Sequence, residues 1–198
     1  MTQRTVFKKE MIVEAAFQLT REQGWGAVTA RNIAQKLASS TMPLYSSLKS
    51  MEEIEKEVRM RAQSCMQEYQ RRKYTENTLL NSAIGYVTFA RDERNLFRFL
   101  YVDRPLTANR PDEPGQARDV VALDGVVDLA DQAAVALKDP VVLYNWAFTH
   151  GLASLISGGV IDLPEERISA IIQEVSAAIY LFSISDMKKL MEGGKKGE

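Results

Sequence analysis

Residues 29–53 read TARNIAQKLASSTMPLYSSLKSMEE, a pattern that predicts two short helices and the start of a third. Thr29 is suited to cap the first helix, because its hydroxyl can accept a hydrogen bond from a backbone N–H that has no partner within the helix. The second helix carries Pro43 in its first turn, where no intrahelical N–H is required. Ser50 and Glu53 have the spacing of a capping box at the start of the third helix. Two short helices joined by a tight turn are typical of helix-turn-helix units that read DNA.

The same residues resemble the DNA-binding domain of the TetR family of bacterial repressors. The shared features are Thr29, Ile33-Ala34, Leu44-Tyr45 and Lys49-Ser50-Met51-Glu52, in the family's order and spacing. The resemblance covers residues 8–58, because the helix that precedes the motif also fits. It implies a helix-turn-helix DNA-binding domain at residues 1–52, with the motif at about 29–48, and a regulatory and dimerisation domain at residues 53–198.

The predicted DNA contacts lie within and beside this motif. Segment 41–47 contains no Arg, Lys, Asn or Gln, the side chains that make strong bidentate contacts with bases, so Arg31 is the candidate for reading a guanine. The resemblance implies that Tyr45 contacts a phosphate. Lys49 is predicted to contribute equally to the affinity for every DNA sequence. The complete predicted set is Thr29, Arg31, Thr41, Met42, Pro43, Tyr45, Ser46 and Lys49.

Three positions depart from the family pattern. Ala38 stands where the turn usually has glycine, Ser39 where it usually has a hydrophobic residue, and Met51 where the family commonly has a phosphate-binding lysine. Together with the plain composition of segment 41–47, these departures leave open a second interpretation. In that interpretation the chain is a helical binding module whose DNA binding is weak or lost.

Composition indicates a soluble cytoplasmic protein with an uneven charge distribution. The net charge is −1, yet residues 1–50 carry seven Lys or Arg against three Glu, an excess of four positive charges. A basic N-terminal part on an acidic body is typical of a DNA reader with a separate regulatory domain. Cys65 is the single cysteine, so no intramolecular disulfide is possible, as suits the cytoplasm. No apolar run approaches the length of a membrane span, and no signal region is seen at the N-terminus.

Apolar periodicity predicts an all-α fold of about nine helices, and no stretch has the alternation of a strand. Three prolines and a glycine predict a surface loop at residues 103–116. Outside the helix-turn-helix motif, helices are predicted at about residues 7–23, 50–74, 76–91, 96–100, 117–137, 140–157 and 164–189.

The helix at 140–157 carries a second resemblance. Trp146, His150 and Gly151 are similar to the Trp…His-Gly signature of one subgroup of TetR regulatory domains. Small side chains on one face of this helix would let another helix approach closely. The resemblance implies a homodimer that binds an inverted repeat in double-stranded DNA. The predicted interface consists of Ala147, Gly151, Ser154, Ile168, Ile172, Val175 and Ile179.

Aromatic residues predict a site for a small apolar or aromatic effector. The predicted pocket residues are Tyr86, Phe97, Tyr101, Trp146 and His150. A single histidine cannot form a zinc site without partners, and neither a nucleophile motif nor a glycine-rich phosphate loop is present, so we expect no metal, no cofactor and no enzymatic activity. A regulator controlled by a protein partner remains the alternative to one controlled by a small molecule.

Overall fold

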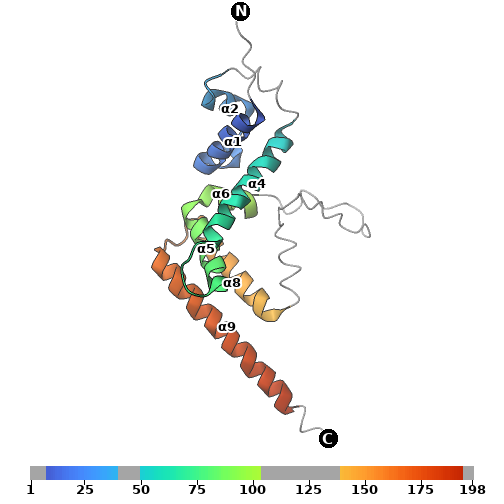
Figure 1. The fold of residues 1–198 in the computed structure, drawn as a ribbon, viewed down its shortest axis with the longest axis vertical. Coiled ribbons are helices and arrows are strands. Elements are labelled where there is room, and N and C mark those ends of the chain that lie inside the picture. The colour runs from blue at the N-terminus through green and yellow to red at the C-terminus, as the bar shows by residue number, and fades with distance from the viewer. Residues whose placement is uncertain (1–7, 40–49, 104–138, 194–198) are drawn as a thin grey trace, which may run out of the picture. The chain divides into compact units, whose positions relative to one another are not determined.

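The computed structural model describes residues 8–39, 50–103 and 139–193, with side chains up to Ser183 (Figure 1). These ranges contain helices and no strand, so the all-α class is confirmed. The second helix of the motif, the loop at 104–116 and the helix predicted at 117–137 lie outside the described residues. The described helices are α1 (Lys9–Gln23), the 3-10 helix η1 (Trp25–Ala27), α2 (Ala30–Lys36), α4 (Met51–Gln70), α5 (Thr78–Asp92), α6 (Arg94–Tyr101), α8 (Pro140–Ser157) and α9 (Glu165–Gly193).

We call α1, η1 and α2 together (residues 8–39) the head. The predicted end of α1 at Gly24 is confirmed, because this glycine has φ +84° and its N–H donates to Thr20 O. The apolar residues spaced three and four apart on one face of α1 are buried: Ile12, Ala15, Ala16 and Leu19. The predicted cap of α2 is also confirmed, since Thr29 Oγ1 accepts a hydrogen bond of 3.1 Å from Asn32 N. Ile33 and Ala34 of α2 are buried as predicted.

The turn after α2 places Ala38 in a backbone conformation that favours glycine. Ala38 adopts φ +50°, which lies in the left-handed region that glycine occupies without strain. Ala38 N donates to Gln35 O at 3.0 Å, and Ser39 N donates to Ala34 O at 2.9 Å. This pair of hydrogen bonds is a Schellman motif, which satisfies the last carbonyls of the helix. The chain therefore makes the turn with an alanine in a glycine conformation.

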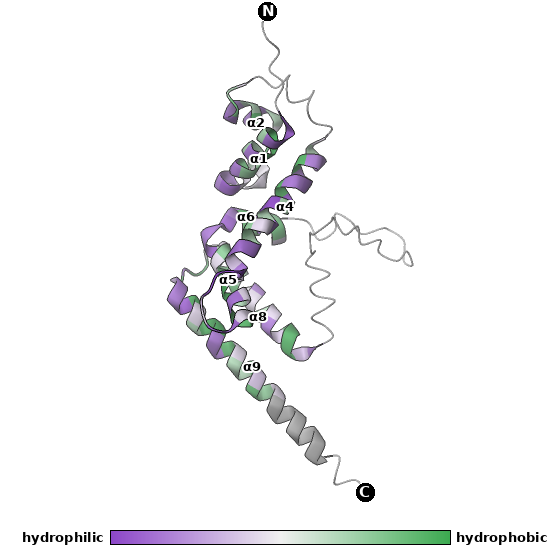
Figure 2. Ribbon diagram, in the orientation of Figure 1, coloured by the Kyte–Doolittle hydropathy of each residue, from purple (hydrophilic) through white to green (hydrophobic). Residues whose placement is uncertain are grey.

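Helix α4 begins after Ser50, whose Oγ accepts a hydrogen bond of 3.2 Å from Glu53 N. The predicted core positions from Ile54 to Tyr69 are largely buried, and polar and apolar residues alternate along the helix in Figure 2. Two positions of the predicted apolar face differ. Met51 is 39% exposed, because it lies in the first turn of the helix, and Cys65 is half-buried. The helix ends at Gln70, earlier than the predicted end near residue 74.

The chain divides into two compact units. Unit 1 consists of residues 1–68 and 92–127, and therefore contains the head, most of α4 and α6. Unit 2 consists of residues 69–91 and 128–198. The grouping of α6 with the head could not be read from the sequence, because residues 69–91 separate α6 from α4. The predicted boundary between residues 52 and 53 stays a prediction.

Within unit 2, helix starts are set by polar caps. Asn77 Oδ1 accepts from Leu79 N at the start of α5, and Asp139 Oδ1 accepts from Val141 N at the start of α8. Helix α9 begins one residue after Pro164, whose carbonyl accepts from the N–H of Ile168, so this proline precedes the helix instead of lying in its first turn. Helices α8 and α9 pack against each other as predicted.

Close backbone packing joins α5 to the end of α4. A Cβ atom added to Gly85 would lie 2.3 Å from Tyr69 O and 2.6 Å from the Cα of Gln70. Only glycine fits at this crossing without displacing backbone. Within the described part of the chain, no helix combines the length and apolar composition needed to cross a membrane.

Candidate functional site

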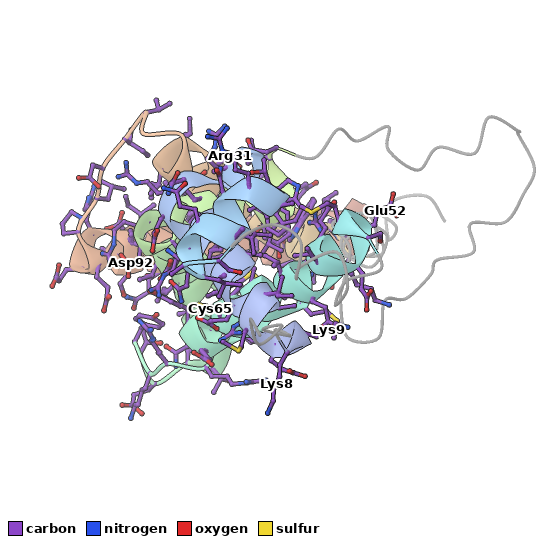
Figure 3. All side chains as sticks on the ribbon, turned by 90° about the horizontal axis from the view of Figure 1, so that it is seen from above. Lys8, Lys9, Arg31, Glu52, Cys65 and Asp92 are labelled. Carbon is purple, nitrogen blue, oxygen red and sulfur yellow. The ribbon has the colours of Figure 1, made fainter. Side chains whose placement is uncertain are left out.

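Arg31 and Thr29 are the two predicted DNA-contacting residues that the structure describes. Both are exposed, and Thr29 uses its hydroxyl as the cap of α2. The guanidinium of Arg31 has no ion-pair partner among the described residues, and in Figure 3 it points away from the ribbon. The other six residues of the predicted set lie outside the described residues: Thr41, Met42, Pro43, Tyr45, Ser46 and Lys49.

Most other cations of the head are held by carboxylates. Lys36 Nζ lies 2.9 and 2.8 Å from the two carboxylate oxygens of Glu22. Arg21 forms a bidentate pair with Glu93, in which Nε donates to Oε2 at 2.7 Å. Lys8 resembles Arg31, since it is exposed, has no ion-pair partner in the described ranges and points away from the ribbon on the opposite side in Figure 3.

An exposed row of ion pairs connects α1 to α4. Lys9 Nζ lies 2.8 Å from Glu53 Oε1 and 2.7 Å from Glu57 Oε1. The hydrogen bonds that the Lys9 ammonium donates to Glu53 and to Glu57 raise its pKa above the ordinary value. Glu14 of α1 pairs with Arg61, which continues the spacing of four residues along α4. This row was not predicted, although the spacing of residues 53, 57 and 61 indicates one face of α4.

A shallow groove of about 360 Å³ follows this row of ion pairs. Its lining combines charged and apolar side chains from α1 and α4. It is lined by Lys9, Glu10, Val13, Glu57, Met60, Arg61 and Ser64.

A buried arginine connects α4 to α6. Arg59 Nη1 donates to Phe99 O at 3.3 Å and to Leu100 O at 3.4 Å, while Nη2 donates to Glu55 at 2.9 Å. The last carbonyls of a helix have no intrahelical donor, so Arg59 supplies one to the end of α6. Its guanidinium also lies over the Phe99 ring, 4.4 Å from the centroid. This role could not be predicted from the sequence, because an arginine in an amphipathic helix is ordinarily exposed.

The head contacts α6 through an aromatic pair and a carboxylate. The rings of Trp25 and Phe99 stack with centroids 4.9 Å apart. Glu93, which precedes α6, has a side chain that is 5% exposed and holds Arg21 of α1. Asn95 Nδ2 donates to Arg21 O at 3.0 Å. Phe99 therefore contacts both η1 and the arginine on α4, so α6 is the common partner of the head and α4 in unit 1.

The five residues predicted for an effector pocket separate into two groups. In unit 2, Tyr86 Oη lies 2.9 Å from His150 Nδ1, and the ring of Trp146 stacks on His150 with centroids 5.8 Å apart. Burial lowers the pKa of His150, which favours the neutral imidazole. In unit 1, Phe97 is fully buried in the core, and the Tyr101 hydroxyl donates to Met66 Sδ at 3.2 Å. Phe97 is therefore a core residue and not a surface that a ligand can reach.

The residues predicted for a dimer interface also divide. On α8, Ala147 and Gly151 are exposed, and a Cβ added to Gly151 would meet nothing within 4 Å. Ser154 of α8 and Val175 and Ile179 of α9 are half-buried. Ile168 and Ile172 are 0% and 1% exposed within the single chain, and their role in a dimer interface stays a prediction. Their side chains fill the core of unit 2.

Large apolar residues beside the small ones on α8 were missed. Tyr144 and Leu155 are 48% and 46% exposed, and they continue the spacing of Ala147 and Gly151 along the helix. The signal was present in the sequence as a repeat of three and four residues. Among the side chains of α9 up to Ser183, the large apolar ones that are exposed are Tyr180, Leu181 and Phe182.

The described residues contain no group of three or more His, Cys, Asp or Glu side chains placed to hold a metal ion. Neither a scan against models of known protein families nor a search of curated proteins found a match to this chain.

Proposed function

We propose that this chain is a sequence-specific DNA-binding transcription regulator, a homodimeric repressor that a small apolar or aromatic effector releases from its operator. The observation that carries the proposal is the geometry of the head. Thr29 caps α2, the helix ends in a left-handed turn at Ala38, and Arg31 on that helix is exposed and without an ion-pair partner in the described ranges. A short capped helix that ends in a tight turn is the first half of a helix-turn-helix.

In this proposal Arg31 reads a base and the following segment positions the head. A guanidinium can donate two hydrogen bonds to the O6 and N7 atoms of guanine, which is the commonest specific contact in the major groove. The side chains of Thr41, Met42, Pro43 and Ser46 supply weaker polar or methyl contacts. Tyr45 and Lys49 hold the phosphate backbone, which sets position but not sequence preference.

The homodimer is proposed from the exposed face of α8. Gly151 and its neighbour Ala147 leave room for a second helix, and the large apolar side chains of Tyr144 and Leu155 are exposed beside them. A two-fold arrangement would match an inverted-repeat operator, with half-sites about 34–36 Å apart. Light scattering at micromolar concentration tests this part of the proposal, and a monomer would contradict it.

The effector is proposed to act in unit 2, at Tyr86, Trp146 and His150. These three side chains come from α5 and α8. His150 lies between the other two, because it contacts both the Tyr86 hydroxyl and the Trp146 ring. The stacked rings and the neutral imidazole favour an apolar or aromatic ligand with a single hydrogen-bonding group. Isothermal titration against candidate aromatic compounds, with Trp146→Ala as the comparison, measures this interaction.

The decisive experiment is a selection from random duplexes followed by affinity measurements at fixed salt. We expect Arg31→Ala to lose about 1–3 kcal/mol of discrimination at one base position. Arg31→Lys keeps the charge but not the bidentate geometry, so it should lose the same discrimination while retaining the salt dependence. Lys56→Ala is the matched control, because Lys56 is exposed and has no ion-pair partner in the described ranges. An unchanged preferred sequence and affinity in Arg31→Ala would exclude Arg31 as the reader.

Two alternatives make different predictions in the same experiments. A helical binding module without DNA affinity is favoured by the plain composition of segment 41–47 and by the paired state of Lys9 and Lys36. It predicts no duplex binding even at low salt. A regulator controlled by a protein partner predicts normal operator binding that no small aromatic molecule releases.

A further inference from the structure

The described part of the head carries five cations, and three of them are already bound to carboxylates. Lys9 is the most strongly held, since its ammonium has two carboxylate partners within 2.8 Å. Arg21 and Lys36 have one carboxylate partner each. Lys8 and Arg31 have no ion-pair partner in the described ranges. The head therefore offers far fewer cations to a polyanion than its composition suggests.

The ammonium of Lys9 lies at the start of α4, so its ion pairs change the charge of that surface. Glu53 lies in the first turn of α4, which begins at Met51, two residues after Lys49 in the sequence. The ammonium of Lys9 is thus held beside the first turn of α4, and this turn follows in sequence the segment that is proposed to contact the DNA backbone. Without the two glutamates it would be an exposed cation at that place, since its side chain is 39% exposed.

The pair of carboxylates reverses the local charge. One ammonium with two carboxylates carries a net charge of −1, and Glu52 in the same turn adds another negative charge. Glu52 is exposed, has no ion-pair partner in the described ranges and projects from α4 in Figure 3. A phosphate that approaches the start of α4 therefore meets a negative surface, although a lysine lies there.

We propose that Glu53 and Glu57 withhold Lys9 from DNA phosphates and thereby restrain sequence-independent binding. The inference rests on the proposed function, because it concerns the surface that would face DNA. Sequence-independent affinity comes almost entirely from phosphates neutralised by lysine and arginine, so each withheld cation weakens it. Sequence preference comes from base contacts and is left to Arg31. Glu53 and Glu57 are then determinants of specificity that touch no base.

The experiment compares two double variants that remove the same charge. E53Q/E57Q removes both partners of Lys9, whereas E10Q/E52Q removes two exposed carboxylates that have no ion-pair partner in the described ranges, at the starts of the same two helices. Binding to a fluorescent duplex of random sequence is measured between 50 and 200 mM salt. One released cation per protomer, which is two per bound dimer, should make the loss of affinity over this range about 12-fold larger in E53Q/E57Q. E10Q/E52Q should bind somewhat tighter but keep the salt dependence of the wild type.

Lys9→Met gives an independent test that does not depend on changing the start of α4. A withheld ammonium makes no phosphate contact, so this variant should keep the salt dependence of the wild type. The triple variant K9M/E53Q/E57Q should lose the extra salt dependence of E53Q/E57Q. Circular dichroism and urea unfolding establish that each variant is folded.

The outcomes separate this inference from the proposed function. If the wild type binds duplexes and E53Q/E57Q matches E10Q/E52Q, the withholding of Lys9 is wrong and the proposed function stands. A weaker salt dependence in Lys9→Met would also overturn it, because Lys9 would then contact phosphate in the wild type. If neither the wild type nor any variant binds a duplex at 50 mM salt, the proposed function fails and the inference fails with it.

Discussion

In unit 1, α4 contacts α6 on one side and α1 on the other through the same kinds of interaction, but the two sets of interactions differ in burial. On each side an arginine pairs with a glutamate and lies over a phenylalanine ring, Arg59 over Phe99 at 4.4 Å and Arg61 over Phe17 at 5.0 Å. The side chain of Arg59, which faces α6, is 7% exposed, whereas that of Arg61, which faces α1, is 47% exposed. Burial is therefore the main difference between the two junctions.

Because of this difference, we expect salt to weaken the contact of α4 with α1 more than its contact with α6. An exposed ion pair is screened by water and salt, and contributes little to the free energy of unfolding. A buried guanidinium must keep its partners, because leaving a charge or a carbonyl unpaired away from water is costly. We therefore expect the contact of α4 with α6 to persist at high salt and the contact with α1 to loosen.

The largest effect is expected at the buried junction. Arg59→Met should lower the free energy of unfolding by about 2–3 kcal/mol, because two carbonyls at the end of α6 and the carboxylate of Glu55 lose their donor. Glu55 is 34% exposed, which keeps the cost below that of a fully buried pair. Urea unfolding followed by circular dichroism measures the change. A loss below about 0.5 kcal/mol would remove the distinction between the junctions.

A change of intermediate size is expected in the head, away from both junctions. Ala38→Gly should raise the free energy of unfolding by about 0.5–1 kcal/mol, since glycine adopts φ +50° without strain although it has more freedom in the unfolded chain. The control is Ala30→Gly, a change within α2 at an ordinary helical position, which should be destabilising. Equal effects of the two variants in thermal unfolding would contradict the strained turn.

The smallest effect is expected at the exposed junction. Arg61→Met should change the free energy of unfolding by less than about 0.5 kcal/mol, and the change should shrink further above 0.5 M salt. Comparing Arg59→Met and Arg61→Met in the same salt series sharpens the contrast directly. A salt-independent loss as large as that of Arg59→Met would show that both junctions behave as buried contacts.

Helix starts and ends were predictable from local chemistry. Thr29, Asp139 and Gly24 act within a few residues of their own position, so their roles follow from neighbours in the chain. The inner face of α1 was predictable for the same reason, because a helix places residues three and four apart on one side. The need for a left-handed residue at Ala38 was visible only as a departure from the family pattern.

The candidate site was predictable in part. Arg31 could be singled out from composition alone, because segment 41–47 lacks the side chains that read bases. The division of the aromatic residues between two units could not be predicted, since Phe97 and Tyr86 are both aromatic and nothing in the sequence distinguishes their surroundings. Ile168 and Ile172 show the same ambiguity, because an apolar stripe does not reveal whether it faces its own chain or another.

The helical class, the caps and the short helix that carries Arg31 follow from the amino-acid sequence, since they depend on interactions within one or two turns of the chain. Helix packing sets which charges are exposed to a partner. Lys9 and Glu57 are 48 residues apart, and Arg59 meets carbonyls 40 and 41 residues away. Such pairings depend on how helices pack, because an ion pair over so long a sequence separation has no local pattern. The burial that this packing produces also sets how much the loss of one partner of an ion pair changes the free energy of unfolding, which is little at an exposed pair and much at a buried one.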